Sequence, residues 1–239
     1  MSCPATPLAF RERMIDLALP RHADREQVRR LIGALRARGP VVGTDEVGRG
    51  PLAGPVVAAA VLLTEEQELA LLKLGLRDSK RMAPRARERV FAAMQAMGAA
   101  WAAQAGSVAR IERENIRCTS LWAMGRSVAR LCAAKGFEPV CVVVDGPAFV
   151  PGLEAEQWPL VTADALAPVV SAASVAAKVL RDRVMTRLDA LYPGYGLAQH
   201  KGYPTAAHRE AVRRLGPSPV HRRSFCRKCL AEPEARLWI

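Results

Sequence analysis

Two adjacent carboxylates, Asp45 and Glu46, follow a short apolar segment that the sequence predicts to be a strand over residues 41–44. A glycine-rich turn over residues 48–54 comes directly after them, and glycine lets a backbone adopt a positive φ or approach a ligand closely. Arg49 lies in this turn, and its planar guanidinium suits bidentate contact with phosphate. Acidic groups beside a flexible basic turn indicate a metal-assisted reaction on a phosphate group.

Two further acids have the same local context. Asp145 ends the apolar, β-branched run of residues 140–144, and Asp164 follows a third predicted strand near Leu160. Carboxylates gathered at neighbouring strand ends repel one another unless a cation neutralises them, and oxygen ligands of this kind select Mg²⁺ or Mn²⁺. Two such ions can activate a water and stabilise the leaving oxygen of a phosphodiester. The candidate catalytic and metal-binding residues are therefore Asp45, Glu46, Asp145 and Asp164.

Each acid also has a purely structural interpretation. Asp145-Gly146 is an ordinary turn dipeptide, and Asp164 could cap the helix that follows it. Adjacent strand residues point to opposite faces, so Asp45 and Glu46 cannot both face one site in a regular strand. Either the strand breaks at Glu46 or Glu46 contributes partly through its backbone carbonyl. The acids taken together with the basic charge of the chain favour the metal site.

The charge of the chain indicates a polyanionic partner. The 239 residues carry a formal net charge of +12, and residues 176–228 alone hold twelve Lys and Arg against three acids. Nucleic acid is the default candidate for such a chain, although a solvated basic face that only improves solubility is the alternative. Half of the residues are hydrophobic, which is enough for one substantial core.

The sequence predicts a cytoplasmic protein. No stretch approaches the apolar length that spans a bilayer, and residues 1–20 contain Arg11, Glu12, Arg13 and Asp16 where a signal peptide needs an apolar core. Six scattered cysteines are too few for a disulfide framework, which agrees with a reducing compartment. Cys226 and Cys229 form a single CxxC, and zinc there is disfavoured because a tetrahedral site needs four ligands.

Hydrophobic periodicity divides the chain into three parts. Residues 1–40 form an arginine-rich extension with eight arginines and one amphipathic helix over residues 24–38, residues 41–225 form the catalytic domain, and residues 226–239 form a short tail. Alternating strands and helices predict an α/β fold, with a central mixed sheet flanked by helices and a helical C-terminal part. Strands are predicted at 41–44, 56–63, 101–108, 140–144 and near 160, and further helices at 84–97, 120–135, 171–191 and 205–215.

Seven sequence blocks in order resemble the type 2 ribonucleases H, and within them the ribonuclease HII family. The blocks occupy residues 43–57, 78–80, 143–146, 171–182, 192–196, 200–205 and 215–225. The resemblance implies a ribonuclease H-like fold and an endonuclease that hydrolyses the RNA strand of RNA–DNA hybrids. It also implies nicking of duplex DNA 5′ to embedded ribonucleotides, with 3′-hydroxyl and 5′-phosphate products and divalent metal. Ribonucleotide removal from DNA, RNA primer removal and a monomeric state are expected.

The resemblance also assigns substrate contacts. It places the four family carboxylates on Asp45, Glu46, Asp145 and Asp164 and surrounds the ribose 2′-OH with Gly48, Arg49, Gly50 and Tyr203. The 2′-OH is the group that distinguishes RNA from DNA locally. Lys80, Ser174 and Lys178 are expected to contact phosphate, and Asp182 is expected to pair with Arg181 or nearby basic residues rather than with metal. Leu166 departs from the family pattern, since many members carry lysine there.

Two rival interpretations lead to different expectations. The related ribonuclease HIII family has glutamate as its fourth acid and lacks the arginine between the first glycines, so Arg49 and Asp164 favour HII. A non-catalytic protein that binds hybrids or structured RNA would require at least one acid among Asp45, Glu46 and Asp145 to be replaced. All three are present.

Overall fold

The molecule is built on a central mixed sheet. The computed structural model describes residue 20 and residues 22–231, and its strand order is β3-β2-β1-β4-β5. β2 pairs antiparallel with β1 and β3, whereas β1, β4 and β5 run parallel to one another. The predicted α/β class with a mixed sheet is confirmed. The strands are β1 (Val41–Val47), β2 (Val56–Leu62), β3 (Ala100–Gly106), β4 (Cys141–Asp145) and β5 (Glu156–Leu160).

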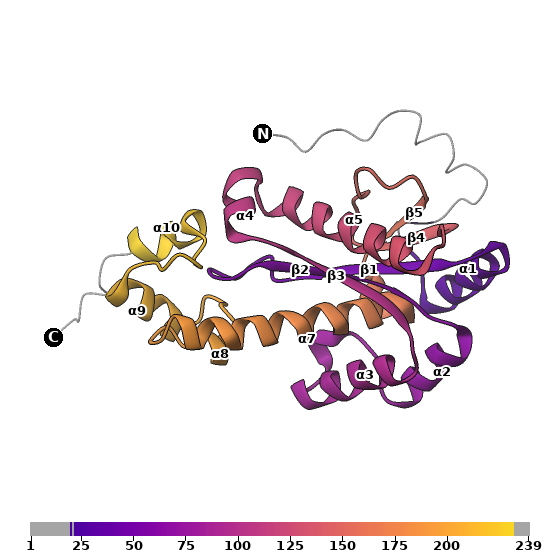
Figure 1. Ribbon diagram of the computed structural model, residues 1–239, viewed down its shortest axis with the longest axis horizontal. Coiled ribbons are helices and arrows are strands. Elements are labelled where there is room, and N and C mark those ends of the chain that lie inside the picture. The colour runs from indigo at the N-terminus through magenta and orange to yellow at the C-terminus, as the bar shows by residue number, and fades with distance from the viewer. Residues whose placement is uncertain (1–19, 21, 232–239) are drawn as a thin grey trace.

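Helices cover both faces of this sheet (Figure 1). The long helix α7 packs on one face with α2 and α3 beside it, α5 packs on the other face, and α8, α9 and α10 gather at one end of the molecule. The helices before α6 are α1 (Arg25–Arg38), α2 (Glu65–Lys73), the 3₁₀ turn η3 (Ser79–Arg81), α3 (Pro84–Ala96), α4 (Val108–Glu114) and α5 (Ile116–Lys135). The later helices are α6 (Ala163–Leu166), α7 (Pro168–Leu191), α8 (Leu197–His200), α9 (Ala206–Leu215) and α10 (Arg223–Ala231).

Parallel pairing brings the acidic residues to one edge of the sheet. Thr44 of β1 pairs with Val144 of β4, so the next residues, Asp45 and Asp145, lie next to each other along the sheet. Asp145 in turn pairs with Leu160 of β5, shortly before Asp164 in α6. β1 does not end at residue 44 as predicted but continues to Val47, because β2 pairs with it throughout.

Gly43 allows α7 to approach the middle of β1. A Cβ atom at Gly43 would lie 2.6 Å from the carbonyl carbon of Val169 in the first turn of α7. A real Cβ cannot come that close to backbone, so any larger residue would push the helix away. The glycine therefore sets the depth at which α7 packs, and that depth brings the helix side chains to the acidic edge of the sheet.

The predicted N-terminal amphipathic helix is confirmed as α1. Asp24 caps it through a capping box with Gln27, which satisfies two backbone donors of the first turn. Val28, Ile32 and Leu35 are buried in the same hydrophobic cluster as strand β1. α1 is therefore packed onto the domain. Residues 1–19 lie outside the described residues.

The C-terminal helices enclose a smaller hydrophobic cluster of their own. Leu197, Val212 and Cys226 are fully buried there, together with Met185 from the end of α7. α10 runs across the predicted boundary between residues 225 and 226, so the part of the expected tail that the structure describes, up to Ala231, is a packed helix. Residues 232–239 lie outside the described residues. In the described part of the chain, no helix has both the length and the apolar character needed to cross a membrane.

Candidate active site

Three carboxylates from three different elements converge at the edge of the sheet. Asp45 comes from β1, Asp145 from the end of β4 and Asp164 from α6, and one oxygen of each lies within 4.8 Å of the others. Asp45 and Asp164 are almost fully buried, with 4% and 3% of their surface exposed, respectively. The predicted convergence of these three acids is confirmed. Within the residues described, they form the only such group of potential metal ligands.

Backbone groups fix the orientation of two of these carboxylates. The backbone N–H of Glu46 donates to Oδ1 of Asp45 at 2.6 Å, and the backbone N–H of Asp164 donates to Oδ1 of Asp145 at 3.4 Å. The hydroxyl of Ser171 on α7 donates to the carbonyl of Asp164 at 2.7 Å, which ties α6 to the long helix. The cluster is therefore held by its own elements before any ligand arrives.

The electrostatics of the cluster favour a bound cation. Burial raises the pKa of Asp45 well above its usual value, and the neighbouring Asp145 and Glu46 raise it further. Burial and the charge of Asp164 raise the pKa of Asp145 in the same direction. The ionised forms of Asp45 and Asp145 are thus disfavoured by their surroundings, and a divalent cation would remove that cost. The donor set is all oxygen, which fits a hard cation such as Mg²⁺ or Mn²⁺.

Glu46 does not join the three aspartates through its side chain. The strand stays regular through Val47, so the alternative in which it breaks at Glu46 is not observed. The carboxylate of Glu46 instead pairs with the guanidinium of Arg49 at 3.3 Å. Burial raises the pKa of Glu46 to about 7 despite this arginine, and the charge of Asp145 also raises it. Glu46 therefore lies close enough to share the field of the cluster.

Lys80 lies at the open side of the cluster. Its ammonium donates to Oδ2 of Asp164 at 3.1 Å, while 77% of its side chain remains exposed. Partial burial alone would lower the pKa of Lys80, but Asp164 outweighs it together with Asp45 and Asp145, so the net pKa is raised. Asp78 positions Lys80 by accepting a hydrogen bond from its backbone N–H at 2.9 Å. A mobile cation thus stands beside the carboxylates and is open to solvent.

Ser174 occupies a different environment from the one expected of a phosphate contact. It is 1% exposed, and its hydroxyl lies 2.8 Å from the hydroxyl of Ser79. Burial raises the pKa of Asp45, and the nearby hydroxyl of Ser174 lowers it by a smaller amount. In this conformation Ser174 supports a carboxylate and does not reach the surface.

Two buried arginines hold the glycine-rich turn. Arg222 donates to the carbonyls of Gly48, Arg49 and Gly54 at distances between 2.6 and 3.0 Å. Arg181 donates to the carbonyls of Ala53, Pro55 and Lys201 at 2.9 to 3.2 Å. Both side chains are 0% exposed, and burial lowers the pKa of Arg222 to about 9, helped by the charge of Arg181. The turn is therefore a fixed surface.

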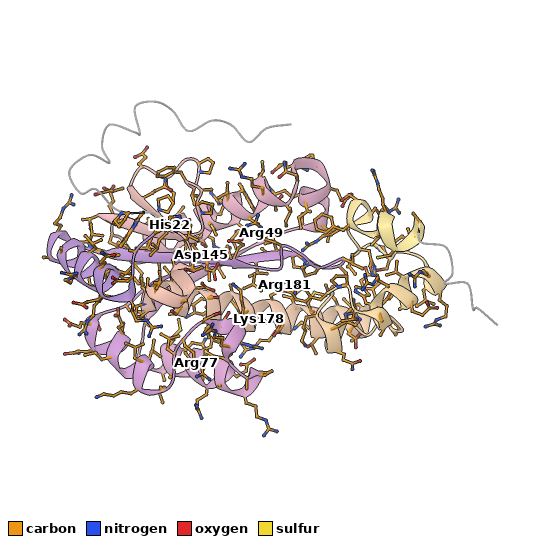
Figure 2. All side chains as sticks on the ribbon, turned by 180° about the vertical axis from the view of Figure 1, so that it is seen from behind. His22, Arg49, Arg77, Asp145, Lys178 and Arg181 are labelled. Carbon is orange, nitrogen blue, oxygen red and sulfur yellow. The ribbon has the colours of Figure 1, made fainter. Side chains whose placement is uncertain are left out.

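Gly48 has a backbone that only glycine adopts easily. Its φ is +102°, and a Cβ atom there would collide with the side chain of Arg181. The neighbouring Arg49 extends outward with 57% of its side chain exposed. Figure 2 shows Arg49, Lys178 and Arg181 on the side of Asp145 that faces the C-terminal helices. Of the three residues in the predicted glycine motif, Arg49 and Gly50 are exposed next to the carboxylates, whereas Gly48 is buried against Arg181.

Tyr203 lies across from this turn. It is 39% exposed, and the charged groups of Lys178 and Arg181 lie 6.0 and 5.8 Å from the centre of its ring. Lys178 also pairs with Asp182 at 2.7 Å, one turn further along α7. Asp182 has Arg87 as a second partner at 3.7 Å and is not part of the carboxylate cluster. The expectation that Asp182 pairs with basic groups is confirmed, although Lys178 takes the place of Arg181.

Three histidines connect Tyr203 to the C-terminal helices. Nδ1 of His208 lies 3.0 Å from the carbonyl oxygen of Tyr203. Nε2 of His208 lies 3.1 Å from Nε2 of His221. Nδ1 of His221 accepts from the backbone N–H of Ser218 at 3.1 Å, so Nε2 of His221 carries the proton that His208 accepts. His200 stacks on His208 and accepts from the N–H of Gly202. The chain of hydrogen bonds from Tyr203 to Ser218 requires the rings of His208 and His221 to be neutral.

We expect His221 to make the fold sensitive to acid. Burial, and then the neighbouring His208, lower the pKa of His221 from 6.5 to about 4. A depressed pKa gives stability that is complete above pH 6.5 and is lost as the pH falls toward 4, up to about 3 kcal/mol. The measurement is the free energy of unfolding in urea between pH 8 and pH 4 for the wild type and for His221→Asn.

The difference between these two profiles isolates the histidine, because the buried carboxylates titrate in both proteins. The advantage of the wild type over His221→Asn should shrink as the pH falls. An advantage that stays constant across this range would contradict the role of neutral His221.

The buried arginines are the functional residues that sequence reasoning missed. Arg181 was expected only as a partner for Asp182, and Arg222 was part of a matching block without a role. Their partners are backbone carbonyls, which have no signature in the sequence. The sequence did indicate that the turn needs support, because three glycines within seven residues make a flexible backbone that other side chains must hold in place.

Solved structures with this fold belong to ribonucleases H. The ribonuclease H2 from Pyrococcus horikoshii OT3 aligns with a TM-score of 0.60 and 26% identity over 80% of this chain and 97% of that chain. Ribonuclease HII in the PCNA:RNase HII complex from Archaeoglobus fulgidus aligns with a TM-score of 0.65 and 25% identity over 81% and 97%. Bst-RNase HIII in complex with Mn²⁺ shares the fold, with a TM-score of 0.67 and 21% identity over 80% and 69%. The fold and the carboxylate cluster thus define an endonuclease of the ribonuclease H class.

Sequence comparisons specify the family. A family model described as ribonuclease HII matches residues 42–228. Ribonuclease HII from Halorhodospira halophila is 48% identical over 186 residues, which cover 77% of this chain and 91% of that protein. Ribonuclease HII from Moorella thermoacetica is also 48% identical, over 77% of this chain and 85% of that protein. The chain belongs to the ribonuclease HII family, and the resemblance seen in the sequence is confirmed.

Proposed function

We propose that this ribonuclease H hydrolyses the RNA strand of RNA–DNA hybrids and nicks duplex DNA 5′ to embedded ribonucleotides. The observation that carries the proposal is the convergence of Asp45, Asp145 and Asp164, whose oxygens lie within 4.8 Å of one another. The products would carry 3′-hydroxyl and 5′-phosphate ends. The reaction would serve the removal of ribonucleotides from DNA and of RNA primers.

Mg²⁺ or Mn²⁺ would be held by the three aspartates. Bound divalent ions would supply an activated water and would stabilise charge on the leaving oxygen of the phosphodiester. Both ions accept an all-oxygen donor set, and a fold neighbour, Bst-RNase HIII, was solved in complex with Mn²⁺. Because the Glu46 side chain is paired with Arg49, its contribution is assigned to the backbone carbonyl and to the charge that it adds to the cluster.

The glycine turn and Tyr203 would recognise the ribose at the cleavage point. Gly48, Arg49 and Gly50 offer small backbone groups that can approach a 2′-OH, and the buried Arg222 keeps the carbonyls of Gly48 and Arg49 in place. The ring of Tyr203 would pack on the next sugar, where an additional hydroxyl would be disfavoured. The cations of Lys178 and Arg181 over this ring limit its movement.

Lys80 and Lys178 would contact the phosphates of the substrate. Lys80 is exposed beside Asp164, so it can neutralise a phosphate that approaches the carboxylates. Lys178 would have to share its ammonium between Asp182 and phosphate. Ser174, buried against Asp45, is reassigned to positioning that carboxylate. We further propose that the enzyme acts as a monomer in the cytoplasm, with residues 41–225 and the rest of α10, up to Ala231, as its catalytic unit.

A duplex DNA with one ribonucleotide tests this function. With Mg²⁺ or Mn²⁺, the strand should be cut immediately 5′ to the ribonucleotide, which then remains on the downstream fragment. The cut should not occur in EDTA or in an all-DNA duplex of the same sequence. Denaturing electrophoresis of strands labelled at either end gives both fragment lengths. Cleavage that survives EDTA, or a cut at the all-DNA control, would refute the proposal.

A further inference from the structure

The short helix that carries Asp164 has little stability of its own. α6 contains four residues, and its N-cap is Thr162, whose φ is +59° and whose side chain makes no capping hydrogen bond. Helices of this length do not form without external support. On the side away from the carboxylates, Ala165 and Leu166 line a hollow of about 470 Å³ between α1 and α2. Leu166 also packs against the main hydrophobic core, so core packing covers α6 only in part on that side.

Two side chains from outside α6 hold its backbone. Ser171 of α7 donates to the carbonyl of Asp164, and Arg25 of α1 donates through Nη2 to the carbonyl of Ala165 at 3.0 Å. Ser171 and Arg25 come from different elements, so together they restrain both the position and the rotation of the turn. Arg25 can act as a fixed support because α1 itself is capped and packed into the main core.

α1 lies outside the part of the chain that the family model matches. The match begins at residue 42, whereas α1 ends at Arg38. Leu166 lines the same hollow as Arg25 and Arg29, at the position where the family resemblance led us to expect a lysine. On the side of α6 where Leu166 replaces this lysine, α1 therefore supplies an arginine, Arg25, that holds the backbone of α6.

We propose that α1 is a positioning element of the metal site and that Arg25 is its positioning residue. Through the carbonyl of Ala165, Arg25 holds α6 so that the carboxylate of Asp164 stays beside Asp45 and Asp145. This inference rests on the proposed function, because it assigns a structural cause to the metal affinity of the same site. It also gives the N-terminal extension a role in the reaction that does not involve contact with nucleic acid.

Positioning and simple electrostatics predict opposite changes in the affinity for a divalent cation when Arg25 is replaced by an uncharged residue. Arg25 is a cation near an acidic cluster, so removing its charge alone would strengthen the binding of a divalent cation. Loss of the hydrogen bond to Ala165 would instead weaken binding, because the third carboxylate would be less well placed. Arg29 is the matched control, since it is also an exposed arginine on α1 that lines the same hollow.

The test is a Mn²⁺ titration of the full chain without nucleic acid, with free Mn²⁺ measured by electron paramagnetic resonance. Arg25→Met keeps an unbranched side chain but removes the guanidinium, and it should raise the Kd for Mn²⁺ about tenfold, the lower end of what outer supports of metal ligands cost. Arg25→Lys should restore part of the affinity. Arg29→Met should leave Kd unchanged or lower it.

An unchanged Kd in Arg25→Met overturns the inference, as does an equal rise in Arg29→Met. Circular dichroism checks that each variant is folded. If Arg25→Met is not folded, the Kd for Mn²⁺ of Arg25→Lys is compared with that of the wild type instead. Asp145→Asn is titrated in parallel and should lose Mn²⁺ binding. If Asp145→Asn loses Mn²⁺ binding while Arg25→Met keeps the Kd of the wild type, the proposed function stands and only the role of α1 is refuted.

Discussion

Asp145→Asn is expected to reduce nicking of a duplex with one ribonucleotide by at least about 100-fold, equivalent to roughly 3 kcal/mol of transition-state stabilisation lost with the metal. The amide keeps the shape of the side chain, so the hydrogen bond from the N–H of Asp164 can be retained by its oxygen. It removes one of the three charges that would hold the cation. Single-turnover cleavage with saturating enzyme measures the chemical step directly.

The same substitution should not destabilise the metal-free protein. The pKa of Asp145 is raised in the folded state, so its ionised form costs stability as the pH rises above the usual value of 3.8. The asparagine side chain of the variant carries no charge, and we expect the melting temperature of the variant in EDTA at about pH 7.5 to equal or exceed that of the wild type. Asp189→Asn, near the far end of α7, is the control. An inactive variant with a lowered melting temperature would indicate misfolding, and normal turnover would refute the catalytic assignment.

Arg222→Ala should be the most damaging single change outside the carboxylates. It leaves the carbonyls of Gly48, Arg49 and Gly54 without their donor in a buried environment. Each buried group that loses its partner costs about 1–3 kcal/mol, so we expect the free energy of unfolding to fall by at least about 3 kcal/mol. The glycine turn would also lose its fixed shape, and ribonucleotide-dependent nicking should fall with it. Urea unfolding and the nicking assay measure the two effects.

Two neighbouring substitutions make this prediction specific. Arg223→Ala removes the same kind of residue at an exposed position and should change the free energy of unfolding by less than about 0.5 kcal/mol. Arg222→Lys retains the charge but has no planar fork to reach three carbonyls, so it should recover only part of the stability. Full recovery by lysine would show that charge alone matters at this position and that the geometry of the guanidinium does not.

Much of the catalytic edge could be predicted from the sequence because strands have a simple geometry. Asp45 and Asp145 each follow an apolar run, and parallel pairing of the two strands places them side by side at one edge of the sheet. The opposite orientation of Glu46 also follows from the alternation of side chains. The sequence could not decide whether the strand breaks at Glu46, because the pairing with β2 that keeps it regular is a tertiary contact.

Other parts of the site depend on packing that has no local signal. Ser174 was expected to contact phosphate because of its sequence block, but the depth at which α7 packs on Gly43 buries it beside Asp45. Lys178 was expected to be free for phosphate, whereas Asp182 one turn away engages it. The supports from Arg25, Arg181 and Arg222 all end on backbone carbonyls of distant residues. Such contacts are visible only once the chain is folded.

Helix α7 contacts both the carboxylates and the glycine-rich turn, so one rigid element sets the distance between these two parts of the site. Ser171 and Ser174 in its first turns touch the carboxylate edge, and Arg181, seven residues after Ser174, touches the turn and the ring of Tyr203. At 1.5 Å per residue, these two points are about 10 Å apart along the axis. Under the proposed function, this helix would therefore fix the distance between the carboxylates and the turn that would contact the ribose. One residue inserted between Ser174 and Arg181 would rotate its far half by about 100° and turn Arg181 away from the turn, however well each end still folded.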